Sequence, residues 1–87
     1  MTYKFDLTTK AKNDIEFFKK SGNTQILSKV FELINSIVQT PYSGIGKPEA
    51  LKHQFSGLWS RRINKEHRLI YEVLENEILI HSLKGHY

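Results

Sequence analysis

Hydrophobic and polar positions follow two different periods along this chain, and the change of period divides it into a helical and a strand-rich part. Residues 2–7 alternate, with Tyr3, Phe5 and Leu7 on one side. This alternation is typical of a half-buried β-strand.

Helical spacing follows the first strand. Apolar residues recur at intervals of three and four over residues 8–20 and again over 23–39, which predicts two amphipathic helices. Thr8 or Thr9 can cap the first helix, and Pro41 stops the second. Two helices joined by so short a turn are expected to pair as a hairpin.

The second part of the chain has the period of a strand. Residues 40–48 contain two prolines and two glycines, which predicts a loop. Alternation then predicts strands at 51–55, 58–63, 67–73 and 78–83. The strand at 67–73 is apolar on both sides and is expected to be central. The fold class is therefore α+β: an N-terminal strand and a helical hairpin packed on a mostly antiparallel sheet, in two layers, forming one domain over residues 1–87.

Composition narrows the class of protein. There is no cysteine, so neither a disulfide framework nor a thiolate metal site is available, and four histidines without an i, i+4 pair do not form a zinc site. We expect no metal and no cofactor. No apolar run reaches the length of a membrane span and no signal-peptide core is present, so we expect a cytoplasmic protein without a membrane partner.

The net charge of +4 arises in residues 44–71, which hold six of the 13 Lys and Arg residues against two acids. Phe55, Trp59 and Tyr71 are interleaved with these cations, a pattern that suits a polyanion or an acidic protein partner. A solvated basic face is the other reading of the same pattern. Trp59 can stack on a base, or it can belong to the core or to a dimer interface.

The order of short motifs in residues 44–71 is more specific than the charge. Gly-Lys-Pro-Glu, Leu-Lys-His, Ser-Gly-x-Trp-Ser-Arg-Arg-Ile and Glu-His-Arg-Leu-Ile-Tyr follow one another, and the chain closes on His86-Tyr87. This series resembles the YoeB/Txe branch of the RelE toxin superfamily, the toxin halves of bacterial toxin–antitoxin pairs. Over residues 1–39 the resemblance is one of pattern and length.

The resemblance implies a catalytic site. Metal-free RNA cleavage needs a base for the ribose 2′-OH, a cation for the transition-state charge and an acid for the 5′ leaving oxygen. The family positions matched by Glu49, Arg68 and His86 imply these roles in that order, and Tyr87 matches a residue that helps to place the substrate. Without the surrounding motif, each residue has a plainer interpretation. Glu49 would be a solvated loop acid, Arg68 would pair with Glu66 or Glu72, and His86 would be a disordered or exposed terminal histidine.

Other basic residues are candidates for phosphate contacts. They are Lys47, Lys52, Arg61, Arg62 and Lys84, and for each a place on a solvated basic face is the alternative. Two positions depart from the family pattern. Ala50 stands where a second proline is common, which loosens the loop carrying Glu49. Lys84-Gly85 replaces a common Arg-Tyr pair, which removes one stacking ring.

The resemblance therefore implies an mRNA interferase that cuts mRNA in the ribosomal A site and leaves a 2′,3′-cyclic phosphate. It also implies an acidic YefM/Axe-like antitoxin as partner, and a homodimer. One alternative is a ParE-like toxin that poisons DNA gyrase by binding, which would not need Glu49 and His86 together. A plain RNA-binding module is another.

Overall fold

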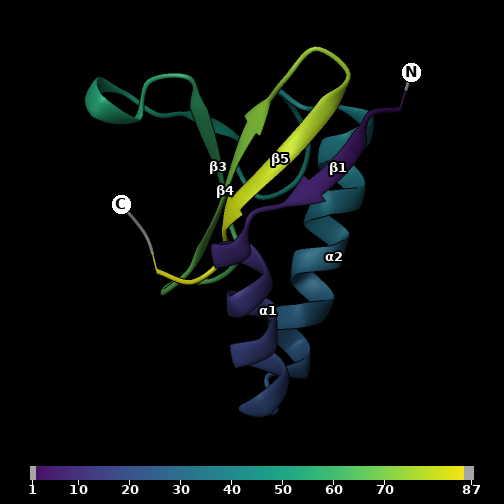
Figure 1. Cartoon of the computed structure of the whole chain (residues 1–87), viewed down its shortest axis with the longest axis vertical. Helices are drawn as coiled ribbons and strands as arrows, with labels where there is room; N and C mark the ends of the chain where they lie inside the picture. The colour runs from purple at the N-terminus through teal and green to yellow at the C-terminus, as the bar shows by residue number, and fades with distance from the viewer. Residues whose placement is uncertain (1, 86–87) are drawn as a thin grey trace.

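A computed structural model describes residues 2–85 and confirms the α+β class. The elements follow one another as β1 (Lys4–Leu7), α1 (Thr9–Lys20), α2 (Thr24–Gln39), β2 (Glu49–Ala50), a 3₁₀ helix (His53–Phe55), β3 (Leu58–Arg62), β4 (Arg68–Val73) and β5 (Glu77–Ser82). Figure 1 shows the two helices side by side, joined by a short turn, which confirms the predicted hairpin.

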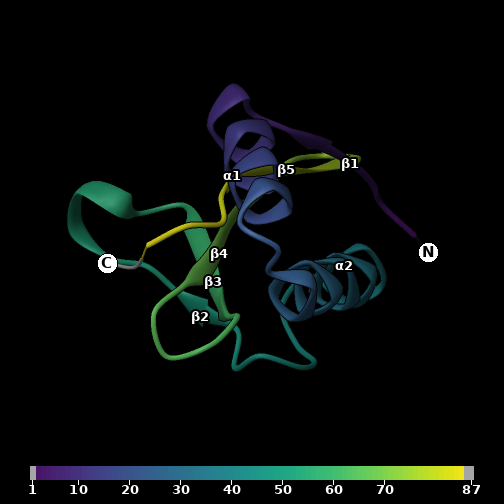
Figure 2. The same cartoon turned by 90° about the horizontal axis from the view of Figure 1, so that it is seen from below.

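The strands form one five-stranded sheet in the order β1-β5-β4-β3-β2. β1 runs parallel to β5, while the other neighbouring pairs are antiparallel, so the sheet is mostly antiparallel as predicted. β4 is the central strand, as its two-sided apolar pattern indicated. We call the face that carries α1 and α2 the inner face and the opposite one the outer face (Figure 2).

Capping sets the start of α1. The Thr8 hydroxyl accepts a hydrogen bond from the Ala11 N–H at 3.1 Å, and the same hydroxyl donates to the His81 carbonyl at 2.7 Å. One side chain thus begins the helix and ties it to the strand β5 beneath it.

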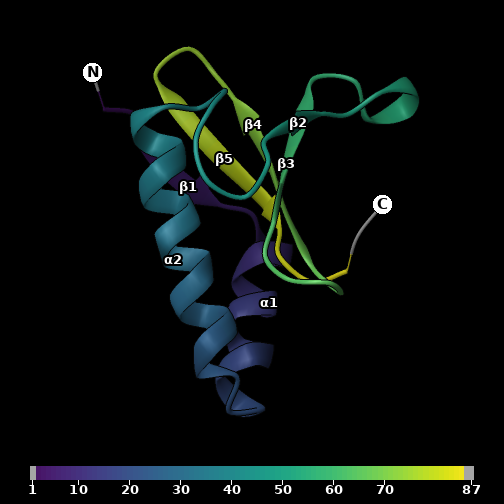
Figure 3. The same ribbon diagram turned by 180° about the vertical axis from the view of Figure 1, so that it is seen from behind.

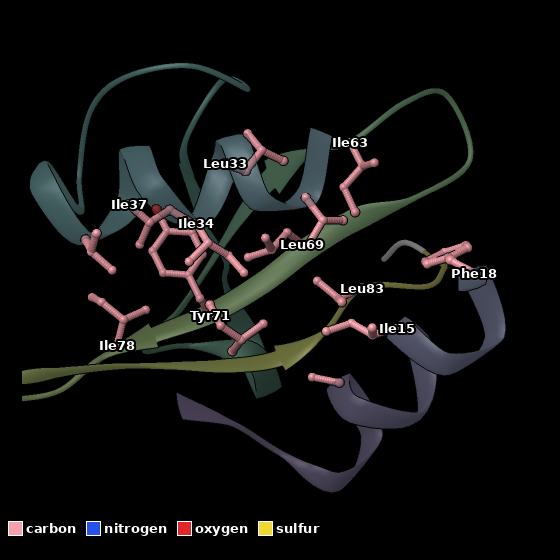
Figure 4. Packing of buried hydrophobic residues seen from close by; sticks show 14 residues of the cluster. Ile15, Phe18, Leu33, Ile34, Ile37, Ile63, Leu69, Tyr71, Ile78 and Leu83 are labelled. Carbon is pink, nitrogen blue, oxygen red and sulfur yellow. The ribbon is translucent and has the colours of Figure 1, made fainter. Parts of the chain in front are cut away.

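The core lies between the helices and the inner face (Figure 4). Its buried members are Ala11, Ile15, Phe18, Val30, Leu33, Ile34, Ile37, Val38, Ile63, Leu69, Tyr71, Ile78, Ile80 and Leu83. The helical residues recur at the predicted spacing, and the strand residues alternate, so each element buries one side. Phe5 of β1 is an exception, because 47% of its surface is exposed.

The predicted strand at 51–55 is wrong. Pairing with β3 ends where the Leu51 N–H donates to the Leu58 carbonyl at 2.9 Å, and His53 has a φ of 59°, which a strand does not accommodate. Residues 51–57 instead form a projecting segment with one 3₁₀ turn, which we call the arm (Figure 3). Its alternating sequence resembles a strand, yet β2 itself contains only Glu49 and Ala50.

Among the described residues, neither helix has the length and apolar character needed to cross a membrane.

Candidate active site on the outer face

Strand register places Glu49 on the outer face. Glu49 of β2 pairs with Ser60 of β3, and Ser60 pairs with Ile70 of β4, which in turn pairs with Ser82 of β5. Directly paired residues point to the same face, so these four side chains form a row across the sheet. Glu49 is exposed at the end of this row, whereas the other three are buried.

Two arginines lie next to that row. Arg62 pairs directly with Arg68 across β3 and β4, on the same face as Ser60 and Ile70. Like charges in a direct cross-strand pair destabilise a sheet, so the pair suits a site that receives an anion. Glu49 and Arg68 stand two strands apart and are offset by two residues along the strands, about 12 Å by ordinary strand spacing and rise. Both side chains are long enough to reach one ligand.

Arg68 has no carboxylate partner within the described residues, contrary to the pairing with Glu66 or Glu72 that the sequence left open. Glu72 instead contacts His81, with 3.0 Å between the carboxylate oxygen and Nε2. Arg68 is half-buried and its backbone N–H donates to the Gly85 carbonyl at 2.8 Å. Among residues 2–85, no carboxylate therefore competes with a bound anion for its guanidinium.

His86 and Tyr87 lie outside the described residues, so their proposed roles stay predictions. The chain that leads to them can be followed to Gly85, whose backbone bonds to the first residue of β4. Gly85, the residue before His86, is thus hydrogen-bonded to the backbone of Arg68.

Lys47 and Arg62 border an open basic hollow. This hollow has a volume of about 480 Å³ and is lined by Lys29, Gly46, Lys47, Arg62, Ile63, Asn64 and Lys65. Four of these residues are cations and none is an acid, which favours a phosphate. Sequence reasoning did not single out Lys29 and Lys65, because only the fold brings α2 and the β3–β4 turn together.

Two of the other three predicted phosphate contacts, Lys52 and Lys84, lie away from this hollow. Lys52 is exposed at the base of the arm, beside the 3₁₀ turn. The ammonium of Lys84 stands over the ring of Phe17 in α1, 3.8 Å from the ring centroid. A cation–π contact of this kind directs the Lys84 ammonium toward α1.

Arg61 is not a phosphate contact, and that prediction is wrong. It points to the inner face and is fully buried, while its neighbour Arg62 is exposed. The Arg61 guanidinium donates to the Tyr71 hydroxyl at 3.2 Å, the Ser36 hydroxyl at 2.8 Å and the carbonyls of Ile45 at 3.1 Å, Thr40 at 2.7 Å and Ser43 at 2.8 Å. Backbone dipoles of the 40–45 loop thus solvate a buried cation, and the cation fixes the loop.

Two glycines let the loop come this close. A Cβ on Gly44 would stand 2.6 Å from the Ser36 hydroxyl, and one on Gly46 would stand 2.7 Å from a Leu33 methyl. Both residues also have positive φ, 120° and 82°. The loop is therefore packed against Arg61 on its way to Glu49.

Tyr71 belongs to the same hydrogen-bond network as Arg61 and the 40–45 loop. Its hydroxyl donates to the Pro41 carbonyl at 2.6 Å, and burial raises the pKa of Tyr71 above its usual value, so the hydroxyl keeps the proton that this bond needs. Trp59 pairs with Tyr71 across the strands and is half-buried against the core, with its ring centroid 5.1 Å from that of Tyr42. Trp59 thus packs against the core, and its roles in base stacking or a dimer interface stay predictions.

Sequence reasoning missed Ser60. Its hydroxyl is buried between Glu49 and Ile70 and has no hydrogen-bond partner in the part of the chain that the structure describes. Across residues 2–85, no three His, Cys, Asp or Glu side chains come together in a way that could hold a metal ion.

Comparison with known proteins points to one family. The model of the YoeB-like toxin of bacterial type II toxin–antitoxin systems matches residues 7–87. Toxin YoeB of Escherichia coli strain K12 is 51% identical over 74 residues, which is 85% of this chain and 88% of that protein.

Solved structures agree with this match. The YoeB dimer from Staphylococcus aureus superposes with a TM-score of 0.89 at 40% identity, covering 100% of both chains. The chain in a YoeB–YefM complex from the same organism gives a TM-score of 0.87 at 41% identity, again covering 100% of both chains.

Proposed function

The chain belongs to the family of YoeB-like toxins of bacterial type II toxin–antitoxin systems, and on that basis we propose that it is a ribosome-dependent mRNA interferase. It cleaves mRNA in the ribosomal A site and so inhibits translation. The observation that carries the proposal is the outer-face arrangement of Glu49, Arg62 and Arg68, in which a carboxylate lies near two cations that have no carboxylate partner among the described residues.

The proposed reaction is an in-line transfer at one phosphate. Glu49 takes the proton of the ribose 2′-OH, whose oxygen attacks the adjacent 3′-phosphorus. Arg68 stabilises the added negative charge on the phosphoryl oxygens, and Arg62 binds the same or the next phosphate. His86 gives a proton to the departing 5′-oxygen. The products are a 2′,3′-cyclic phosphate and a 5′-OH, so the reaction needs no metal.

The ribosome supplies what so small an enzyme lacks. In-line attack requires the 2′-oxygen, phosphorus and 5′-oxygen to be nearly collinear, and stacked single-stranded RNA resists this geometry. Much of a nuclease's rate comes from positioning, and the outer face of one five-stranded sheet offers little surface to grip a flexible strand. A ribosome that holds the mRNA fixes its path into the site.

We expect slow cleavage of naked RNA at high enzyme concentration and far faster cleavage on translating ribosomes, at the A site. Because a base and an acid are both present, the chemistry itself does not require the ribosome. Primer extension on one transcript, with and without ribosomes, measures both rates, and Glu49→Gln is the control that should abolish both. Equal rates in the two conditions, or cuts unrelated to the reading frame, would contradict the proposal. No cleavage in either condition would favour the gyrase-binding or plain RNA-binding alternative.

We also propose that the chain binds an acidic YefM-like antitoxin and self-associates, like the proteins of the YoeB–YefM complex and the YoeB dimer from Staphylococcus aureus. Acids of the antitoxin would cover Arg62 and Arg68, in keeping with electrostatic complementarity. Its apolar residues would fill a groove of about 440 Å³ between β1 and the helices. Phe5 and Phe31 line this groove and are 47% and 52% exposed.

Antitoxin binding is expected to weaken with salt without vanishing. Salt screens the acid–arginine contacts but has little effect on apolar contact in the groove. Titration of the complex from low to high salt measures this, and Arg62→Gln should flatten the salt dependence. Lys20→Gln, which removes an exposed charge at the end of α1, is the matched control and should not. Affinity that does not change with salt, or simultaneous binding of RNA and antitoxin, would speak against the shared surface.

A further inference from the structure

We infer that Asp14 and His67 are positioning residues, which together hold residues 83–85, the segment before His86, against β4 at Arg68. The inference rests on the proposed function, because that function gives His86 the role of general acid. Neither residue touches the outer-face cluster. Both act on the backbone of residues 83–85.

Three successive backbone N–H groups are bound by these two side chains. Strand pairing of β5 with β4 ends at Ser82, so the residues after it have no strand partner in the ladder. The N–H groups of Leu83 and Lys84 donate to Asp14 Oδ2 at 2.8 and 3.1 Å, and the Gly85 N–H donates to His67 Nδ1 at 2.9 Å. The side chains of Asp14 and His67 therefore accept the three N–H groups that a neighbouring strand would otherwise bind.

Asp14 is an unusual residue for the place it occupies. It lies on the buried side of α1 and is only 6% exposed, although carboxylates seldom enter a core. Lys10 compensates its charge from one turn earlier, with Nζ at 2.9 and 2.8 Å from the two oxygens. Oδ2 accepts both backbone N–H groups in addition to its contact with Lys10, and such charge-assisted bonds are stronger than neutral ones.

His67 is fixed from two sides. Its ring makes an edge contact with the fully buried Phe18, with 5.2 Å between centroids. To accept from Gly85, Nδ1 must be unprotonated, so the neutral ring carries its proton on Nε2. The Gly85 carbonyl accepts in turn from the Arg68 N–H. The adjacent residues His67 and Arg68 thus bind the N–H and the carbonyl of Gly85, respectively.

We call Asp14, His67 and the backbone of residues 83–85 that they bind the clamp. It attaches the segment before His86 directly to β4, the strand that carries Arg68. A general acid must lie within hydrogen-bond reach of the leaving oxygen, so a small displacement costs rate without weakening substrate binding. Loss of the His67 acceptor is therefore expected to lower kcat and to leave KM nearly unchanged.

The test compares two substitutions of His67. His67→Phe keeps a ring against Phe18 and removes the acceptor, whereas His67→Asn removes the ring and places Oδ1 near the position of Nδ1. Cleavage of ribosome-bound mRNA is measured across a range of ribosome concentrations, for variants with a wild-type circular dichroism spectrum. We expect His67→Phe to lower kcat about tenfold with KM within about twofold of wild type, and His67→Asn to restore most of kcat.

Amide hydrogen exchange provides a readout that does not depend on activity or on the variants. In the wild-type protein the amides of residues 83–85 should be protected, and His67→Phe should expose that of Gly85. Rapid exchange in the wild type, unchanged kcat in His67→Phe, or equal losses in both variants would each overturn the inference. A wild-type protein that cleaves no mRNA would instead defeat the proposed function, so the two failures are distinguishable.

Discussion

Glu49→Gln, Arg68→Ala and His86→Gln are each expected to reduce mRNA cleavage about a hundredfold or more while leaving the chain folded. Glutamine at position 49 keeps the size of the side chain but cannot accept the 2′-OH proton. Alanine at position 68 removes the charge that balances the pentavalent phosphorus. The exposed Glu49 and half-buried Arg68 contribute little to the core, so stability should change little.

Primer extension on translating ribosomes and growth after induction both measure this loss. Glu66→Gln makes the same chemical change at an exposed carboxylate in the β3–β4 turn and serves as control, with wild-type cleavage expected. Two of the three variants arresting growth at the wild-type level, while folded by circular dichroism, would show that the site is assigned wrongly.

Arg61→Met is expected to lower the free energy of unfolding by about 3–5 kcal/mol, a large part of the stability of a small domain. Methionine fills much of the space but donates nothing, so the carbonyls of Thr40, Ser43 and Ile45 each lose the bond from the guanidinium. The Thr40 carbonyl keeps the Ser43 N–H as donor and the Ser43 carbonyl keeps the Thr40 hydroxyl. All the bonds from one buried, charged donor are lost together, and hydrogen bonds from charged groups contribute more than neutral ones. The loop that leads to Glu49 would loosen at the same time.

Urea unfolding gives the difference directly, with Arg62→Met as the matched control. The control makes the identical substitution one residue away at an exposed position and should change stability by about 0.5 kcal/mol or less. Arg61→Lys should recover little, because a single ammonium cannot reach acceptors on both sides of the planar guanidinium. Equal stabilities of the two methionine variants would mean that the buried network contributes nothing to folding.

The helices could be predicted from sequence because local signals agree with the tertiary fold. Thr8 caps α1, Pro41 follows α2, and the apolar spacing matches the face that is buried. The arm could not be predicted in this way. Its alternation at Leu51, His53 and Phe55 satisfies the rule for a strand, but the positive φ of His53 turns the chain away from β3.

The two adjacent arginines show how far sequence reasoning about a site extends. Charge alone assigned both to phosphate, although period two places Arg61 on the same side as Trp59 and Ile63, and Arg62 on the opposite side. The sequence alternation therefore already indicated that Arg61 and Arg62 face opposite sides of the sheet. By contrast, only the fold brings Lys29 of α2 to Arg62, or Asp14 of α1 to Leu83, because these pairs lie far apart in the chain.

The bonds that join the two ends of the chain bear on when a newly made copy acquires its structure. Thr8 binds His81 and Asp14 binds Leu83 across sequence separations of 73 and 69 residues, and β1 has its strand partner only in β5. Such high-contact-order pairings form late, since a long loop must close first. During vectorial synthesis β1 and α1 emerge early and wait for residues 77–85. The copy that a ribosome is making therefore remains without its complete sheet, and without the clamp beside Arg68, until that segment has left the exit tunnel.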